Sequence, residues 1–225
     1  MQDVVHKNLQ KSPADARIAA IWWWAKRVLM TALFVYLLLT ASKALRETFD
    51  NNNFPEALAV KVELLPIIFP LHMFAGGLAL LLVPLALVLR HTRWHRWAGR
   101  IAAVDILVAG ITAIPVALAA PLTPVAAAGF STQAVVWIAL LTKGYWHIRN
   151  SEVAAHWRAM VMLAAVTSGA VFFRIYLALW AIFGDNHYLK TFYGLDSWAA
   201  WVAPLLITTL ILKFRPLAAK PALRL

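Results

Sequence analysis

Several apolar runs in the sequence are long enough to cross a lipid bilayer as an α-helix. The run at 65–89 holds no lysine, arginine or acidic residue, and it exceeds the roughly 20 residues that a spanning helix needs. Only α-helices and closed β-barrels satisfy their backbone polar groups inside lipid, and these runs are continuous rather than alternating. The sequence therefore predicts an all-α integral membrane bundle.

Composition agrees with a membrane protein. The chain is 62% hydrophobic and 14% charged, with a mean hydropathy of +0.71, whereas about 25% of residues are charged in an average soluble domain. It has no cysteine, which excludes disulfides, thiolate metal sites and cysteine nucleophiles. The net charge of +11 is carried mainly by short connections. We therefore expect the lipid bilayer, and not nucleic acid, as the partner of these basic residues.

The apolar runs predict six spanning helices within a single domain that covers residues 1–225. The spans are expected at about 25–44, 65–89, 98–119, 125–147, 156–182 and 197–214, with tails at 1–20 and 215–225. Three tryptophans at 22–24, followed by Lys26 and Arg27, are typical of a water–lipid interface. Residues 1–20 are polar and mixed in charge, so we expect no cleavable signal peptide.

Basic residues are distributed unevenly over the connections. With the N-terminus inside, the inner segments hold 16 of the 21 lysines and arginines, many of them in the loop around 90–100. The outer loops hold Lys43, Arg46, Lys61 and Lys190. Because positive residues stay on the cytoplasmic side, this asymmetry predicts that both termini are cytoplasmic. The expected location is the inner (plasma) membrane, crossed several times.

Three polar residues are expected at one depth in the outer half of the membrane. His72 on the second span, Gln133 on the fourth and Arg174 on the fifth fall at similar depths when each helix rises about 1.5 Å per residue. Gly76 and Gly77 follow His72 by one turn and would let a helix or a flat ring approach closely. The layer is interpreted either as helix packing or as a cofactor pocket in which His72 is a ligand or hydrogen-bond donor.

A second polar group is expected near the inner face. Asp105 is the only acidic residue within the six predicted spans, and a charge in lipid needs a pair, so we expect an ion pair with Arg158 or Arg96. His95 and His156 each lie at the start of a span on this side. Histidines on facing helices are the usual axial ligands of haem iron, which makes these two the candidate metal ligands.

The motifs resemble a known family. They are His72 followed by a glycine-containing apolar helix, the stretch HRWAGR at His95–Arg100, the stretch HWRAM at His156–Met160, and Arg174. In these features residues 65–180 resemble the uncharacterised bacterial membrane proteins grouped as domain of unknown function 2306. That resemblance implies a helical membrane fold but no particular activity. The layout is also similar to helical membrane b-type cytochromes, which bind haem between histidines of facing helices.

Three functions remain open at this point. The first is a haem b-binding or quinone-reactive redox subunit, in which His72, Gln133 and Arg174 form an outer cofactor site and His95 and His156 an inner ligand pair. The second is a small transporter or proton-relay protein that uses His72, Asp105 and Arg174. The third is an accessory or assembly subunit that works with other membrane subunits. The sequence identifies no catalytic residue and no substrate.

The basic asymmetry makes a testable prediction about topology. Cytoplasmic reporters fused after Arg93, after Arg149 and at the C-terminus should be active, whereas reporters after Asn52 and Asn186 should respond only to the outside. A single fusion on the opposite side would contradict the six-span arrangement with both ends inside.

Overall fold

The computed structural model describes residues 13–50 and 54–214, and within these ranges the chain forms helices and no strand. The predicted all-α class is confirmed there, whereas the outer parts of the predicted tails, 1–12 and 215–225, lie outside the described residues. The chain consists of two compact units, Met1–Leu37 and Leu38–Leu225. Each unit is described by itself.

In the first unit the described element is the larger part of helix α1 (Pro13–Glu47). Its apolar side chains are largely exposed, among them Trp22, Val28 and Met30. A helix that is apolar on all sides is suited to contact with lipid rather than with water. Arg27 stacks over the ring of Trp23 at 3.8 Å, a pairing typical of the bilayer interface.

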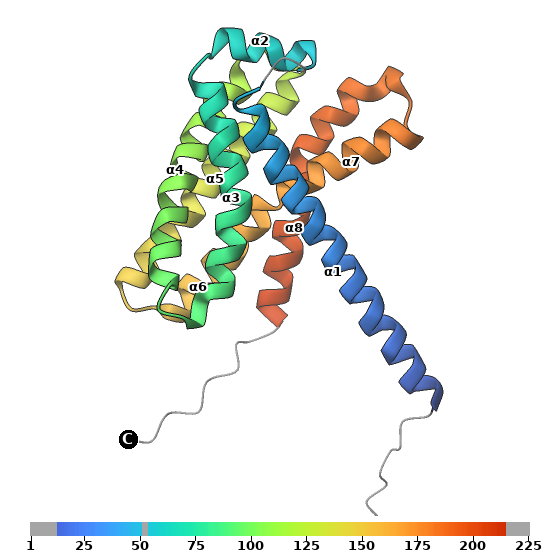
Figure 1. The fold of residues 1–225 in the computed structure, drawn as a ribbon, viewed down its shortest axis with the longest axis vertical. Helices are drawn as coiled ribbons and strands as arrows, with labels where there is room; N and C mark the ends of the chain where they lie inside the picture. The colour runs from blue at the N-terminus through green and yellow to red at the C-terminus, as the bar shows by residue number, and fades with distance from the viewer. Residues whose placement is uncertain (1–12, 51–53, 215–225) are drawn as a thin grey trace, which may run out of the picture. The chain divides into compact units, whose positions relative to one another are not determined.

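The second unit is built around four neighbouring helices (Figure 1). They are α3 (Ile68–Val88), α4 (His95–Leu118), α5 (Pro124–Arg149) and α6 (Val153–Thr167). Their buried faces meet in one apolar core, which contains Val83, Ile106, Leu141 and Leu163. Short connections join them, so successive helices pack as antiparallel neighbours, as in other helical bundles.

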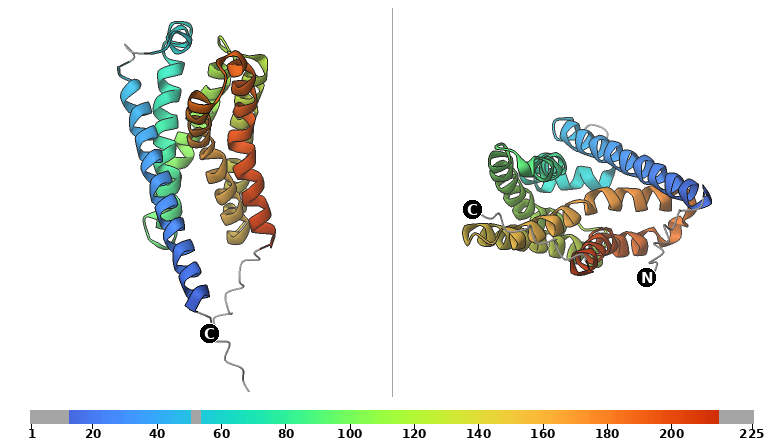
Figure 2. Two further views of the ribbon diagram at one scale, coloured as in Figure 1. Left: turned by 90° about the vertical axis from the view of Figure 1, so that its right-hand side faces the viewer. Right: turned by 90° about the horizontal axis from the view of Figure 1, so that it is seen from below.

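The remaining elements of the second unit complete the bundle. They are α2 (Glu56–Leu64), the short 3-10 helices η1 (Leu89–His91) and η2 (Asn186–Tyr188), α7 (Gly169–Phe183) and α8 (Leu189–Phe214). Helix α8 packs against α5, α6 and α7 (Figure 2). Helix α8 therefore contacts both α6 and α7, the two helices that make up the predicted fifth span.

The six-span architecture is confirmed within the described residues. By length and composition, the helices able to cross a membrane are Arg17–Glu47, Ile68–His91, His95–Leu118, Pro124–Arg149, Val153–Phe183 and Asn186–Phe214. The sixth begins earlier than the expected residue 197, because the mixed aromatic stretch after Asn186 is already helical and packs against α7. The structure does not assign an inner and an outer side, so the orientation stays a prediction.

One lysine of helix α2 is hydrogen-bonded to the C-terminal end of α4. The ammonium of Lys61 donates to the carbonyl of Val116 at 2.8 Å and also to that of Ala119. Carbonyls in the last turn of a helix have no donor within the helix, and a positive charge there complements the helix dipole. Burial lowers the pKa of Lys61. Lys61 therefore caps the C-terminal end of α4, a spanning helix that also contains Pro115.

Two glycines mark close helix contacts, and a third marks open space. A Cβ added at Gly129 on α5 would collide with Ser197 on α8, and one added at Gly144 on α5 would collide with Met160 on α6. A Cβ added at Gly76 on α3 would meet no atom within 4 Å. The small residue at Gly129 thus allows the backbone of α8 to approach, as in other membrane bundles, and Gly144 leaves room for the end of the Met160 side chain.

These glycines provide a matched test of packing. Alanine gains helix propensity at both positions, so the difference between Gly129→Ala and Gly76→Ala reports the collision alone. We expect Gly129→Ala to destabilise the bundle by about 1–3 kcal/mol relative to Gly76→Ala. Thermal unfolding in detergent, followed by tryptophan fluorescence, measures the difference. Equal melting temperatures would show that α5 and α8 do not pack closely.

Candidate functional site

Three histidines share one hydrogen-bonding arrangement. Nδ1 of His72 lies 3.0 Å from the carbonyl oxygen of Ala109, Nδ1 of His95 lies 3.0 Å from that of Ala86, and Nδ1 of His156 lies 2.8 Å from that of Gly144. A carbonyl oxygen only accepts, so Nδ1 carries the hydrogen in each ring. In the neutral imidazole Nε2 then keeps its lone pair, which is the form that binds metals and accepts protons.

The three histidine bonds connect neighbouring helices. His72 on α3 reaches α4, His95 on α4 reaches back to α3, and His156 on α6 reaches α5. Helices α3 and α4 are thereby joined near both ends. Thr112 also lies 3.4 Å from Nδ1 of His72, while its hydroxyl donates to the carbonyl of Val108. The rings are therefore fixed in orientation by backbone groups.

Open space lies beside two of these histidines. Gly76 follows His72 by four residues and Gly99 follows His95 by four residues, so each glycine lies on the same helix face as its histidine, one turn away. A Cβ added at either glycine would meet no atom within 4 Å. The pocket expected beside His72 and Gly76 stays a prediction, and Gly99 provides a second open position that the sequence reasoning did not identify.

The predicted outer layer is held to backbone carbonyls on different helices. Gln133 on α5 donates to the carbonyl of Val166 at 3.2 Å, and Arg174 on α7 donates to the carbonyl of Ala170 at 2.8 Å. Arg174 is exposed on α7. His72 itself is bound to α4. The three residues are thus anchored separately, on three helices.

The expected fifth span consists of two helices with a break at Ser168. Helix α6 ends at Thr167 and α7 begins at Gly169. Two α5 side chains one turn apart donate to this break: Gln133 to Val166, and Trp137 through Nε1 to the hydroxyl of Thr167 at 2.9 Å. Irregular backbone at membrane depth persists only where protein satisfies it, and α5 does so here.

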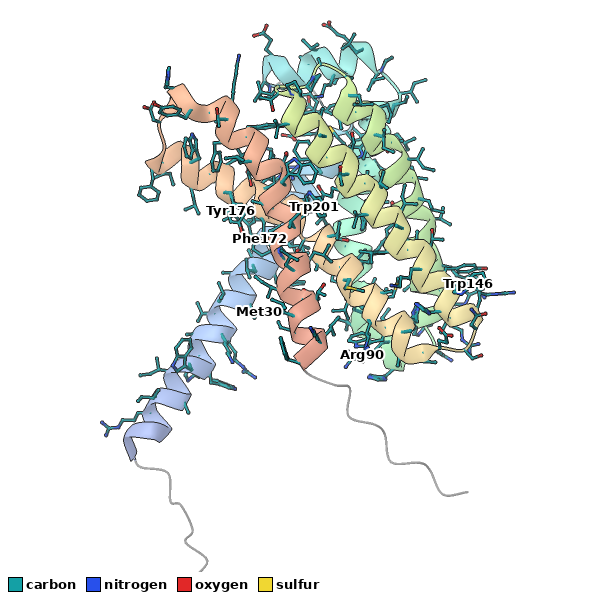
Figure 3. All side chains as sticks on the ribbon, turned by 180° about the vertical axis from the view of Figure 1, so that it is seen from behind. Met30, Arg90, Trp146, Phe172, Tyr176 and Trp201 are labelled. Carbon is teal, nitrogen blue, oxygen red and sulfur yellow. The ribbon has the colours of Figure 1, made fainter. Side chains whose placement is uncertain are left out.

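The two histidines expected as haem ligands lie on different helix pairs. The Nδ1 of His95 is bonded to the carbonyl of Ala86 on α3, and that of His156 to the carbonyl of Gly144 on α5. Figure 3 shows the end of the bundle where Arg90 and Trp146 are labelled. No group of three or more histidine and acidic side chains able to hold a metal ion is found among the described residues. Joint ligation of one iron remains a prediction.

The ion pair expected for Asp105 does not form. Asp105 is buried, and its Oδ2 has no hydrogen-bond partner in the described chain. The ion pairs within the described residues are Lys43–Glu47 and His147–Glu152. Arg96 and Arg158 are exposed instead. The physical reason is that arginines at helix ends extend toward water, where they also stack on aromatic rings, as Arg90 does on Trp157 at 4.6 Å.

One buried acid was missed by the sequence reasoning. Asp196 lies inside the sixth span, is 2% exposed, and has no hydrogen-bond partner on either carboxyl oxygen in the described chain. It immediately precedes residue 197, where the sequence predicts the start of the sixth span, and therefore falls in a predicted loop. The aromatic residues Phe192, Tyr193 and Trp198 around it were the available signal of a membrane segment.

The hydrogen bonds that Gln133 and Trp137 of α5 donate at the break between α6 and α7 are expected to stabilise the bundle. Gln133→Leu and Trp137→Phe each remove one hydrogen bond and should destabilise the bundle by about 1 kcal/mol. Thr142→Val is the matched control, because the exposed Thr142 hydroxyl bonds only to its own helix at Ile138. Proteolysis and thermal unfolding in detergent are the measurements. If the control loses as much stability as Gln133→Leu, the break does not depend on α5.

Comparison with known proteins agrees with the resemblance seen in the motifs. The family model described as "Predicted membrane protein (DUF2306)" matches residues 69–212, well over half of the chain. No curated protein and no solved structure matches the chain. The matched stretch includes the three bonded histidines, Gln133, Arg174 and both buried aspartates. The chain therefore belongs to the DUF2306 family of predicted membrane proteins.

Proposed function

We propose that this multi-pass membrane protein is a redox subunit whose histidines bind haem b or a quinol. The observation that carries the proposal is the shared arrangement of His72, His95 and His156, each with Nδ1 bonded to a backbone carbonyl. Histidine ligands in metalloproteins nearly always donate their second ring nitrogen to a carbonyl or carboxylate, which fixes the tautomer and raises the basicity of the other nitrogen.

The donor chemistry fits haem iron and quinol, and it does not fit an oxidised quinone. The Nε2 lone pair can ligate iron or accept the hydrogen of a quinol hydroxyl. A quinone carbonyl is itself an acceptor and would need a donor that this tautomer lacks. Bound haem would supply one-electron transfer, and a bound quinol would supply electrons together with protons.

His72 is the residue on which we place most weight. Beside it, the open space at Gly76 leaves the helix face accessible to a flat ring. Arg174, expected at the same depth as His72, would favour an anionic substituent, such as a haem propionate. His72 would orient the ligand and accept the proton, while Arg174 would balance the charge of the ligand.

A purely structural role would produce the same histidine bonds. In an accessory or assembly subunit these bonds would serve only to join α3 to α4 and α5 to α6. The two functions differ in what the Nε2 side of each ring does. A ligand role requires the space beside Gly76 to stay open, whereas a structural role is indifferent to it.

The test uses purified protein from cells with ample haem. A redox subunit should show a Soret band that shifts on reduction with dithionite, or tryptophan fluorescence that is quenched by added quinol. The first result identifies haem and the second a quinol. Both signals should be lost in Gly76→Leu, which fills the open space, and in His72→Ala.

Two controls separate ligand loss from misfolding. His91→Ala removes an exposed histidine whose Nε2 accepts from Arg90, and it should leave both signals unchanged. Gly76→Leu should unfold at about the same temperature as the parent protein, because a Cβ added at this position meets no atom of a neighbouring helix within 4 Å. If the parent protein is colourless and its tryptophan fluorescence is not quenched by quinol, the redox proposal is contradicted and the accessory role is favoured.

A further inference from the structure

Asp196 lies on the buried face of α8. Its neighbours on that face, Ser197, Ala200 and Trp201, are all buried, and Asp196 is itself 2% exposed. Helix α8 packs against α5, α6 and α7. The carboxyl group therefore sits at membrane depth, enclosed by protein.

The polar side chains next to Asp196 on its own helix donate their hydrogen bonds to other groups. Ser197 donates through Oγ to the carbonyl of Gly194 at 2.7 Å, and Trp201 donates through Nε1 to the carbonyl of Ser197 at 3.0 Å. Across the helix contact, Gly129 of α5 lies directly against Ser197. Neither Asp196 oxygen receives a hydrogen bond from any described residue. Isolation of this kind strongly disfavours a carboxylate anion and favours the neutral acid.

Among the described residues, no basic side chain forms an ion pair with the carboxyl group of Asp196. The ionisable groups on the packed elements are Lys143, Tyr145, His147 and Arg149 on α5, His156 and Arg158 on α6, Arg174 and Tyr176 on α7, and His187 and Tyr188 on η2. Those of α5 and α6 lie at the other end of their helices. On α8 itself the other ionisable groups are Lys190, Tyr193 and Lys213, and Tyr193 precedes Asp196 by one turn.

An aromatic cluster encloses the same region. The rings of Phe130 on α5, Phe173 on α7 and Tyr193 on α8 are in mutual edge-to-face contact, with centroids 5.1–6.1 Å apart. These three helices thus meet on apolar surface beside the carboxyl, with Arg174 next in sequence to Phe173. Water and large ions are poorly accommodated by such a lining, whereas a proton bound to the carboxyl adds no volume.

We propose that Asp196 is a proton-binding site within the bundle, whose carboxyl is held neutral and which takes up its proton from water and releases it to water. The site does not depend on the redox function proposed above, because it needs neither haem nor quinol. Intramembrane acids enclosed in protein are typical of proton pathways in membrane proteins. Asp105, buried on α4 with one unbonded oxygen, is the natural comparison at another position of the bundle.

A hydrophobic carbodiimide tests the proposal directly. N,N′-dicyclohexylcarbodiimide adds to protonated carboxyls in apolar surroundings, and exposed ionised acids react poorly. With the parent protein in detergent near neutral pH, we expect an adduct that peptide mass spectrometry places on Asp196. The yield of that adduct should fall as the pH is raised. It should be absent in Asp196→Asn and unchanged in Glu63→Gln, a control at an exposed acid of α2.

Infrared spectroscopy gives a second readout without chemical modification. A neutral buried carboxyl should show a C=O stretching band that shifts in deuterated water and is lost in Asp196→Asn but not in Asp105→Asn. Mapping the adduct on the parent protein keeps the test decisive even when Asp196→Asn fails to fold. Labelling of Asp105 without Asp196 would overturn the proposal. Protection of Asp196 by sodium ions would also overturn it, because it would identify a cation site instead of a proton site.

Discussion

Inside a bilayer, a carbonyl that lacks a donor and a side chain that lacks a partner cannot turn to water, and the polar groups of this bundle follow from that constraint. His72, His95, His156, Gln133 and Lys61 all donate to backbone carbonyls of a neighbouring helix. Each bond joins two helices and fixes a polar side chain in the same step. The polar residues are therefore part of how the bundle is assembled, as well as candidates for function.

The break between α6 and α7 depends on the same constraint. Stopping a helix at Ser168 interrupts the backbone ladder, and α5 provides Gln133 and Trp137 at that level. Gly169 lets α8 approach closely, because an added Cβ there would lie 2.8 Å from Cβ of Trp201. Figure 3 labels Trp201 on α8 near this crossing. The chain can thus change direction within the membrane, which places Arg174, Tyr193 and Asp196 on one side of the bundle.

In membrane proteins, buried polar atoms without a hydrogen-bond partner usually have a functional role or form their hydrogen bond with a ligand. In the described chain, Asp105 and Asp196 are the acidic residues with such atoms. The three histidines differ from them, since one ring nitrogen is satisfied and the other keeps a lone pair. The bundle therefore combines fixed proton acceptors with enclosed acids, a combination suited to chemistry that moves electrons or protons.

The sequence by itself determined the class of fold, the number of spans and the family, because hydropathy and length act locally and a bilayer demands about 20 apolar residues per crossing. It also identified His72, Gln133 and Arg174 as polar residues within spans. Only the tertiary structure decided their partners. The bond from His72 to Ala109 joins residues that lie far apart in the chain, and the isolation of Asp105 depends on arginines that extend away from it. Such contacts depend on how helices pack, which local sequence patterns do not specify.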